Sequence, residues 1–145
     1  MAFRTIPAAI CLLLAFFSHA IAQQQDQSID ASADLQKHFA EAYNRGDLDA
    51  MAAVFTEKAT RVTPSGVFQG REAIRQSFQQ ALAMGLHDYS VRRITSSSFG
   101  DYVFNVGEWQ AKLGDKSFHG YYTAILIRDG DQARIMEETV NVAVP

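Results

Sequence analysis

The sequence is poor in cysteine and in long apolar runs, and both shortages limit what the protein can be. Its only cysteine, Cys11, lies in a short apolar segment that runs from Ile10 to Phe17. This segment is shorter than the roughly 20 residues that a helix needs to cross a bilayer. It follows Arg4 and precedes Ala20-Ile21-Ala22, a small-x-small pattern typical of signal cleavage. We therefore expect residues 1–22 to be a signal peptide.

Cleavage after Ala22 would leave an exported chain, periplasmic or secreted, that contains no cysteine. Such a chain has no disulfides, so packing must stabilise it. The remaining 145 − 22 = 123 residues suit one domain, since domains usually have roughly 100 to 150 residues. We expect residues 23–31 to form a flexible polar arm and residues 32–145 to form the domain. No later stretch approaches a membrane span, so we expect no membrane contact after cleavage.

The chain also lacks the patterns of several common sites. Without the signal peptide it has 13 − 1 = 12 basic and 16 acidic residues, with no basic face of the kind that binds nucleic acid. No serine lies in a nucleophile elbow, and no glycine-rich loop could cradle phosphate. His38, His87 and His119 lie outside metal-binding spacings. The sequence therefore predicts no metal, no cofactor and no nucleic-acid partner.

Apolar residues at helical spacing predict three helices in the first half of the chain. The first should begin at Asp30 or Ser32 and end at Gly46, because glycine often follows the last helical turn. Asp47 can cap a short second helix, and Gly70 opens a third. The buried stripes of these helices are expected to contain Leu35, Phe39, Ala42, Tyr43, Met51, Ile74 and Phe78.

The rest of the chain is typical of strands, with many aromatic and β-branched residues. One strand, Ala59 to Thr63, precedes a turn at Pro64-Ser65-Gly66. Connections at Gly114-Asp115 and Asp129-Gly130 predict that the last three strands form an antiparallel meander. The strands after the third helix are expected at residues 86–94, 102–113, 116–128 and 132–142. Helices followed by a long antiparallel sheet indicate an α+β domain.

Three motifs, Asn44-x-Gly46-Asp47, Pro64-x-Gly66 and Gly70-Arg71-Glu72, carry a resemblance that spans roughly Leu35 to Val142. In these motifs the chain resembles the nuclear transport factor 2-like superfamily, which includes SnoaL-like domains and ketosteroid isomerases. The resemblance implies a cone-shaped, strongly bent antiparallel sheet wrapped around three N-terminal helices, with a pocket at its open end. It also implies a homodimer that pairs through the outer face of the sheet.

The same resemblance argues against steroid isomerase chemistry. That reaction uses an aspartate base on the first strand, a tyrosine on the first helix and a protonated aspartate on the sheet. Matching the motifs puts Thr63, Phe39 and Ala124 at these three positions. None of them can remove a proton near neutral pH or stabilise an enolate as those residues do. We expect all three to line the pocket without performing this reaction.

Alternation along the strands predicts further pocket residues, Arg61 beside Thr63 and Tyr122 beside Ala124. The resemblance adds Glu137 and Asn141 from the last strand. Arg61 and Glu137 could form a structural ion pair. Alternatively, Arg61 could hold a polar oxygen of a ligand while Glu137 acts as a general base.

Three functions remain open on these residues. We favour a pocket that binds a small, partly apolar ligand, oriented by Arg61, Tyr122, Glu137 and Asn141. An enzyme that uses Glu137 for proton transfer on a small carbonyl substrate is the alternative. A dimerisation or interaction module without a ligand is the third. Which of Glu108 and Trp109 faces inward also stays open, because a slip of one residue exchanges them.

Overall fold

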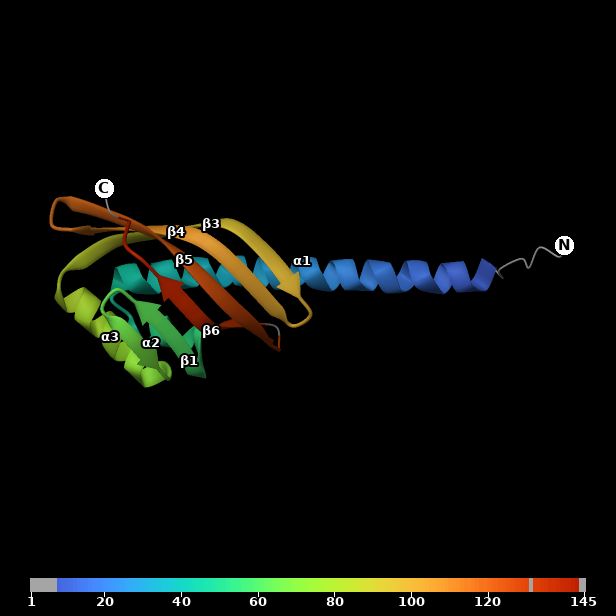
Figure 1. Cartoon of the computed structure of the whole chain (residues 1–145), viewed down its shortest axis with the longest axis horizontal. Coiled ribbons are helices and arrows are strands. Elements are labelled where there is room, and N and C mark those ends of the chain that lie inside the picture. The colour runs from blue at the N-terminus through green and yellow to red at the C-terminus, as the bar shows by residue number, and fades with distance from the viewer. Residues whose placement is uncertain (1–7, 131, 144–145) are drawn as a thin grey trace.

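The computed structural model describes residues 8–130 and 132–143, in which three helices and six strands follow one another (Figure 1). The helices are α1 (Ala8–Arg45), α2 (Leu48–Ala53) and α3 (Arg71–Ala83). The strands are β1 (Phe55–Thr63), β2 (Gly66–Gln69), β3 (Leu86–Phe99), β4 (Tyr102–Leu113), β5 (Lys116–Asp129) and β6 (Gln132–Val140). The predicted α+β class is confirmed.

The strands form one curved sheet in the order β2-β1-β6-β5-β4-β3, and it curves around the C-terminal part of α1 (Figure 1). Neighbouring strands are antiparallel except β1 and β6, which run parallel. The edge strand β2 was not predicted. It forms because the turn after Thr63 brings Gly66 directly opposite that residue, and the chain then pairs back along β1. The α2 and α3 helices pack beside β1.

Helix α1 is longer than the sequence predicts. It continues without a break through residues 23–31, so the expected flexible arm is helical in the structure. No proline or glycine interrupts α1, and its glutamine and alanine residues favour helix. Its N-terminal part projects beyond the sheet (Figure 1). The main-chain oxygen of Ile29 and the hydroxyl of Ser32 each accept a hydrogen bond from Arg93 of β3, at 2.9 Å.

Signal cleavage stays a prediction. In the described part of the chain, no helix carries an apolar stretch long enough to span a membrane.

The motif Asn44-x-Gly46-Asp47 ends α1, caps α2 and ties the end of α1 to β3. Gly46 has a φ of 67°, which glycine adopts without strain. Asp47 Oδ1 accepts a hydrogen bond from the main-chain nitrogen of Ala50 at 3.0 Å, which confirms the predicted cap. The Asn44 amide bonds to both the nitrogen and the oxygen of Tyr89, at 2.7 and 2.8 Å. Asn44 therefore ties the end of α1 to the part of β3 that carries Tyr89.

The core lies between the helices and the concave face of the sheet. The predicted helical stripes are buried, and each of their residues exposes 8% or less: Leu35, Phe39, Ala42, Tyr43, Met51, Ile74 and Phe78. Arg71 locks α3 onto β1, because its Nε and Nη2 donate to the carbonyl oxygen of Phe55 at 2.9 and 2.6 Å. Arg71 thus holds α3 against β1 beside the buried core.

A β-bulge in β6 decides which of two neighbouring carboxylates enters the cone. The pairing with β5 skips Met136, so the alternation of inward and outward side chains shifts by one residue there. Ile135 is buried, but beyond the bulge Glu138 faces inward and Glu137 is exposed. The expectation that Glu137 points into the pocket is therefore wrong. An extra residue in a strand exchanges its two faces.

Candidate functional site

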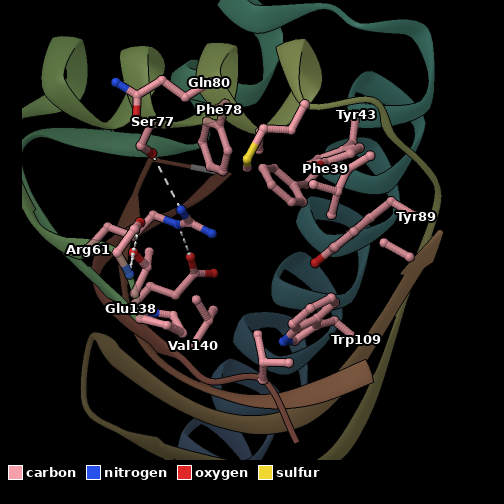
Figure 2. A pocket seen from close by; sticks show the side chains of 18 residues that line it. Phe39, Tyr43, Arg61, Ser77, Phe78, Gln80, Tyr89, Trp109, Glu138 and Val140 are labelled. Carbon is pink, nitrogen blue, oxygen red and sulfur yellow. Dashed lines mark hydrogen bonds and ion pairs between the residues drawn. The ribbon is translucent and has the colours of Figure 1, made fainter. Parts of the chain in front are cut away.

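A cavity of about 370 Å³ opens between α1, α3 and the concave face of the sheet (Figure 2). Each of these elements contributes side chains to its wall. The lining residues include Phe39 and Tyr43 from α1, Arg61 from β1, Ser77 and Phe78 from α3, Tyr89 from β3, Trp109 from β4, and Glu138 and Val140 from β6. A cavity of this size is in the range of small-molecule sites.

One wall of the cavity is aromatic. The rings of Tyr43 and Tyr89 are stacked, with centroids 4.6 Å apart and an interplanar angle of 22°. Phe39 packs against Phe78 at 5.4 Å and meets the edge of Tyr89 at 5.6 Å. Trp109 of β4 lies next to Tyr89 on the same side of the cavity (Figure 2). These rings provide a rigid apolar surface suited to a flat ligand.

The facing wall is polar and carries a partly buried ion pair. Arg61 Nε donates to Glu138 Oε2 at 2.7 Å, and the two side chains are only 15% and 12% exposed. The guanidinium lies 4.5 Å from the centroid of the Phe78 ring, and its Nη1 is 3.4 Å from Ser77 Oγ. The opposite charges cancel within the pair. The cavity therefore presents strong polar groups without a net charge.

Three tyrosine hydroxyls in the cone stay protonated at neutral pH. Burial raises the pKa of Tyr43, which nearby Arg61 partly offsets. Burial also raises the pKa of Tyr89, and the charge of Glu138 adds to this effect. Burial raises the pKa of Tyr122 to about 12. A neutral phenol can donate one hydrogen bond, so these hydroxyls are donors for a polar oxygen.

Most of the predicted inward residues do face the interior of the cone. Phe39 and Thr63, which the resemblance placed in the pocket, and Arg61, which strand alternation placed beside Thr63, line the large cavity. Tyr122 and Ala124 also face inward, but they line a second, smaller cavity. Phe39 lines both cavities, whereas Arg61 and Thr63 line the large one and Tyr122 and Ala124 line the small one. That any of them touches a ligand stays a prediction.

Two predicted residues lie elsewhere. Glu137 is exposed on the convex face because of the β6 bulge. The side chain of Asn141 lies beyond the end of β6, where its Oδ1 accepts from the main-chain nitrogen of Tyr121 at 2.9 Å. Its carbonyl oxygen accepts from Trp109 Nε1 at 2.9 Å. Trp109 faces inward with the alternation of β4 and lines the cavity, and Glu108, which pairs with exposed Arg92, lies on the convex face.

The sequence missed Glu138, Ser77 and Tyr89 as lining residues. Period-two alternation from Leu86 would have put Tyr89 on the other face, but β3 shifts its register between His87 and Ser90. No sequence pattern indicates that Glu138 faces inward, because its orientation follows from the β6 bulge, and a bulge depends on pairing with a neighbouring strand. Within residues 8–130 and 132–143, no three metal-ligating side chains form a group that could hold a metal ion.

Comparison with known proteins gives a family and several solved structures. The model of a family described as a SnoaL-like domain matches residues 35–137. A nuclear transport factor 2-like protein of unknown function from Shewanella oneidensis is 19% identical, with a TM-score of 0.71 over 78% of this chain and 98% of that one. A ketosteroid isomerase-like protein from Erwinia carotovora is 11% identical, with a TM-score of 0.68 over 78% and 94%.

A protein of unknown function from Mycobacterium tuberculosis is 21% identical, with a TM-score of 0.73 over 81% of this chain and 72% of that one. The search of curated proteins gave no match. At such low identities the structural likeness shows a shared fold and leaves activity open.

Proposed function

This chain belongs to the SnoaL-like domain family, and from its cavity we propose that it binds a small, partly apolar ligand without net charge. The observation that carries this proposal is the combination of an aromatic wall with the paired charges of Arg61 and Glu138. Ligand sites are usually concave and mostly apolar, with a few placed polar groups. The cavity has this composition.

The polar groups indicate the chemistry of the ligand. The protonated hydroxyls of Tyr43 and Tyr89 offer hydrogen-bond donors beside the aromatic wall. Glu138 already neutralises Arg61, so a charged ligand would enter a partly buried site with no free opposite charge to meet it. A flat, neutral molecule with a hydroxyl or carbonyl oxygen fits these groups best.

The test is a calorimetric titration of the protein with two probes of similar shape, neutral naphthol and anionic naphthalenesulfonate. We expect saturable binding of one naphthol and weaker binding of the sulfonate. In Glu138→Gln the charge of Arg61 is no longer cancelled, so sulfonate affinity should rise by about tenfold or more. The neighbouring change Glu137→Gln, on the convex face, should leave both affinities unchanged.

Two results would contradict the proposal. One is no saturable binding of either probe. The other is an equal response to Glu137→Gln and Glu138→Gln, because only Glu138 lines the cavity.

The position of Glu138 also favours a second candidate function, proton transfer on a small carbonyl substrate. Among the carboxylates of the described residues, Glu138 is the one that lines the large cavity, where it could act as a general base in place of Glu137. Once a substrate is identified, Glu138→Gln should abolish turnover while Glu137→Gln preserves it. Turnover that survives Glu138→Gln would end this candidate.

We also propose that two copies pair through the convex face of the sheet, where Tyr102, Phe104 and Tyr121 are exposed. Exposed aromatic groups on one face are typical of interaction surfaces. Sedimentation at micromolar concentration should give a dimer, and Phe104→Lys should give a monomer. A wild-type monomer would refute the pairing and leave the cavity proposal intact.

Export is the last part of the proposal. It is supported by the apolar segment and the small-x-small pattern that ends at Ala22. N-terminal sequencing of the protein from its native cells should give a chain that starts at Gln23. A chain that retains residues 1–22 inside the cell would contradict it.

A further inference from the structure

A second cavity lies between α1 and strands β3 to β6, and it measures about 20 Å³. A site needs roughly 10–15 Å³ to admit one water molecule, so this one has room for a single water and little more. Its wall is mostly apolar, from residues such as Leu35 and Leu126. Five polar side chains interrupt that wall: Gln36, Tyr89, Asn105, Tyr122 and Glu138.

Asn105 of β4 lines this cavity and has a buried amide group that lacks one hydrogen-bond partner within the described part of the chain. It is fully buried, with no exposed surface. Its Oδ1 accepts a hydrogen bond from Ser96 Oγ at 2.7 Å. Its Nδ2 is buried and has no hydrogen-bond partner among the described residues. A buried amide that keeps one hydrogen unpaired loses its hydration without compensation, which native proteins usually avoid.

The other polar groups complement Asn105. The hydroxyl oxygen of Tyr122 accepts a hydrogen bond from Gln36 Nε2, so its own proton remains for another acceptor. Glu138 Oε2 accepts a hydrogen bond from Arg61 Nε, and the second carboxylate oxygen of Glu138 is also a strong acceptor. Gly107 faces Tyr122 across the strands, and any side chain there would collide with the ring. Asn105 and Tyr122 thus supply two donors to the cavity, and Glu138 supplies an acceptor.

We propose that this small cavity binds one long-lived water molecule. Asn105 Nδ2 and the Tyr122 hydroxyl donate to the water oxygen, and the water donates to the Glu138 carboxylate. Such a water has the two to four polar partners that buried waters usually make. Glu138 lines both cavities. The water therefore holds the carboxylate from one side while Arg61 holds it from the other, whatever the large cavity binds.

The first test is a high-resolution crystal structure of the wild-type protein. We expect one ordered water within about 2.7 to 3.2 Å of Asn105 Nδ2. A cavity without density, in maps that show other buried waters, would overturn the proposal. This test needs no variant, so it holds even if changes at Asn105 prevent folding.

The second test counts long-lived waters in solution by magnetic relaxation dispersion of water oxygen-17. The change Asn105→Leu keeps a similar size but removes the donor, so one long-lived water should be lost. The matched control is Ser96→Ala, which removes the partner of Oδ1 and leaves Nδ2 in place. It should retain the water. An unchanged count in a folded Asn105→Leu protein would refute the site.

Discussion

Two arginine–glutamate pairs lie on opposite faces of the same sheet. Arg61 and Glu138 pair inside the cone at 2.7 Å, and Arg92 and Glu108 pair on the convex face at 2.8 Å. The inner side chains are 15% and 12% exposed, whereas the outer ones are 67% and 28% exposed. The length of an ion pair therefore says little about its energetic role.

The surroundings decide that role. Water competes for both partners of the outer pair, so breaking it releases two groups that are readily hydrated. Inside the cone, removing one partner leaves the other charge partly buried beside aromatic rings. The inner pair also faces a cavity, where its charges can act on a ligand. The predictions below test this contrast from the largest effect to the smallest.

The largest effect is expected from Glu138→Ala. This change leaves the guanidinium of Arg61 without its carboxylate, and we expect the free energy of unfolding to fall by about 3 kcal/mol. Urea unfolding followed by circular dichroism measures it. The matched control, Glu108→Ala, should hardly move the midpoint. Equal losses in the two variants would show that burial does not separate the pairs.

A smaller effect should follow from replacing both inner partners. In the double change Arg61→Leu and Glu138→Leu no buried charge is left unpaired, so the protein should be more stable than either single variant by about 1 kcal/mol or more. The same urea experiment, run as a double-mutant cycle, gives the coupling. Additive losses would mean that the two charges do not stabilise each other.

The stability of the protein should also fall at alkaline pH, because a tyrosine inside the cone ionises there. Burial raises the pKa of Tyr122 from its ordinary 10.0 to about 12. The stability that comes from keeping this phenol neutral is complete below pH 10.0 and is lost as pH rises toward 12. Thermal unfolding across this range should lose less stability in Tyr122→Phe than in the wild type. Parallel curves for the two proteins would contradict the shift.

The smallest effect belongs to the outer pair at acid pH. The hydrogen bond from Arg92 holds the pKa of Glu108 below its ordinary 4.5. Its contribution is therefore present above pH 4.5 and is lost as pH falls through the folded value. As the pH falls, the Arg92→Ala variant should therefore lose slightly less unfolding free energy than the wild type. High salt should remove this difference between the two proteins. A difference that survives high salt would indicate that the outer pair is shielded from solvent.

Much of this fold could be predicted because its signals are local. The stop at Gly46, the cap at Asp47 and the hairpin at Gly114 each depend on a few neighbouring residues. The strand β4 was predicted with its observed bounds, since alternation and turn residues agree there. The inward position of Thr63 followed from the resemblance, and that of Arg61 from alternation along the same strand.

What could not be predicted depends on contacts between distant segments. The bulge at Met136 arises from pairing with β5, and residues 132–142 alone contain no sign of it. The pocket carboxylate was therefore assigned to Glu137 instead of Glu138. The start of α1 was misplaced for another reason, because polar residues without glycine or proline are compatible with both a helix and a flexible arm.

The bulge at Met136 also bears on how the lining of the cavity could change in evolution. Because Glu137 and Glu138 are adjacent and identical in type, the pairing of β6 with β5 decides which of the two carboxylates enters the cavity. Loss of the Met136 codon would remove the extra residue and leave Glu137 opposite Ile125 and Glu138 opposite Ala124, so Glu138 would still face inward. In this strand, a deletion at the bulge should therefore preserve the lining of the cavity, whereas a substitution of Glu138 changes it.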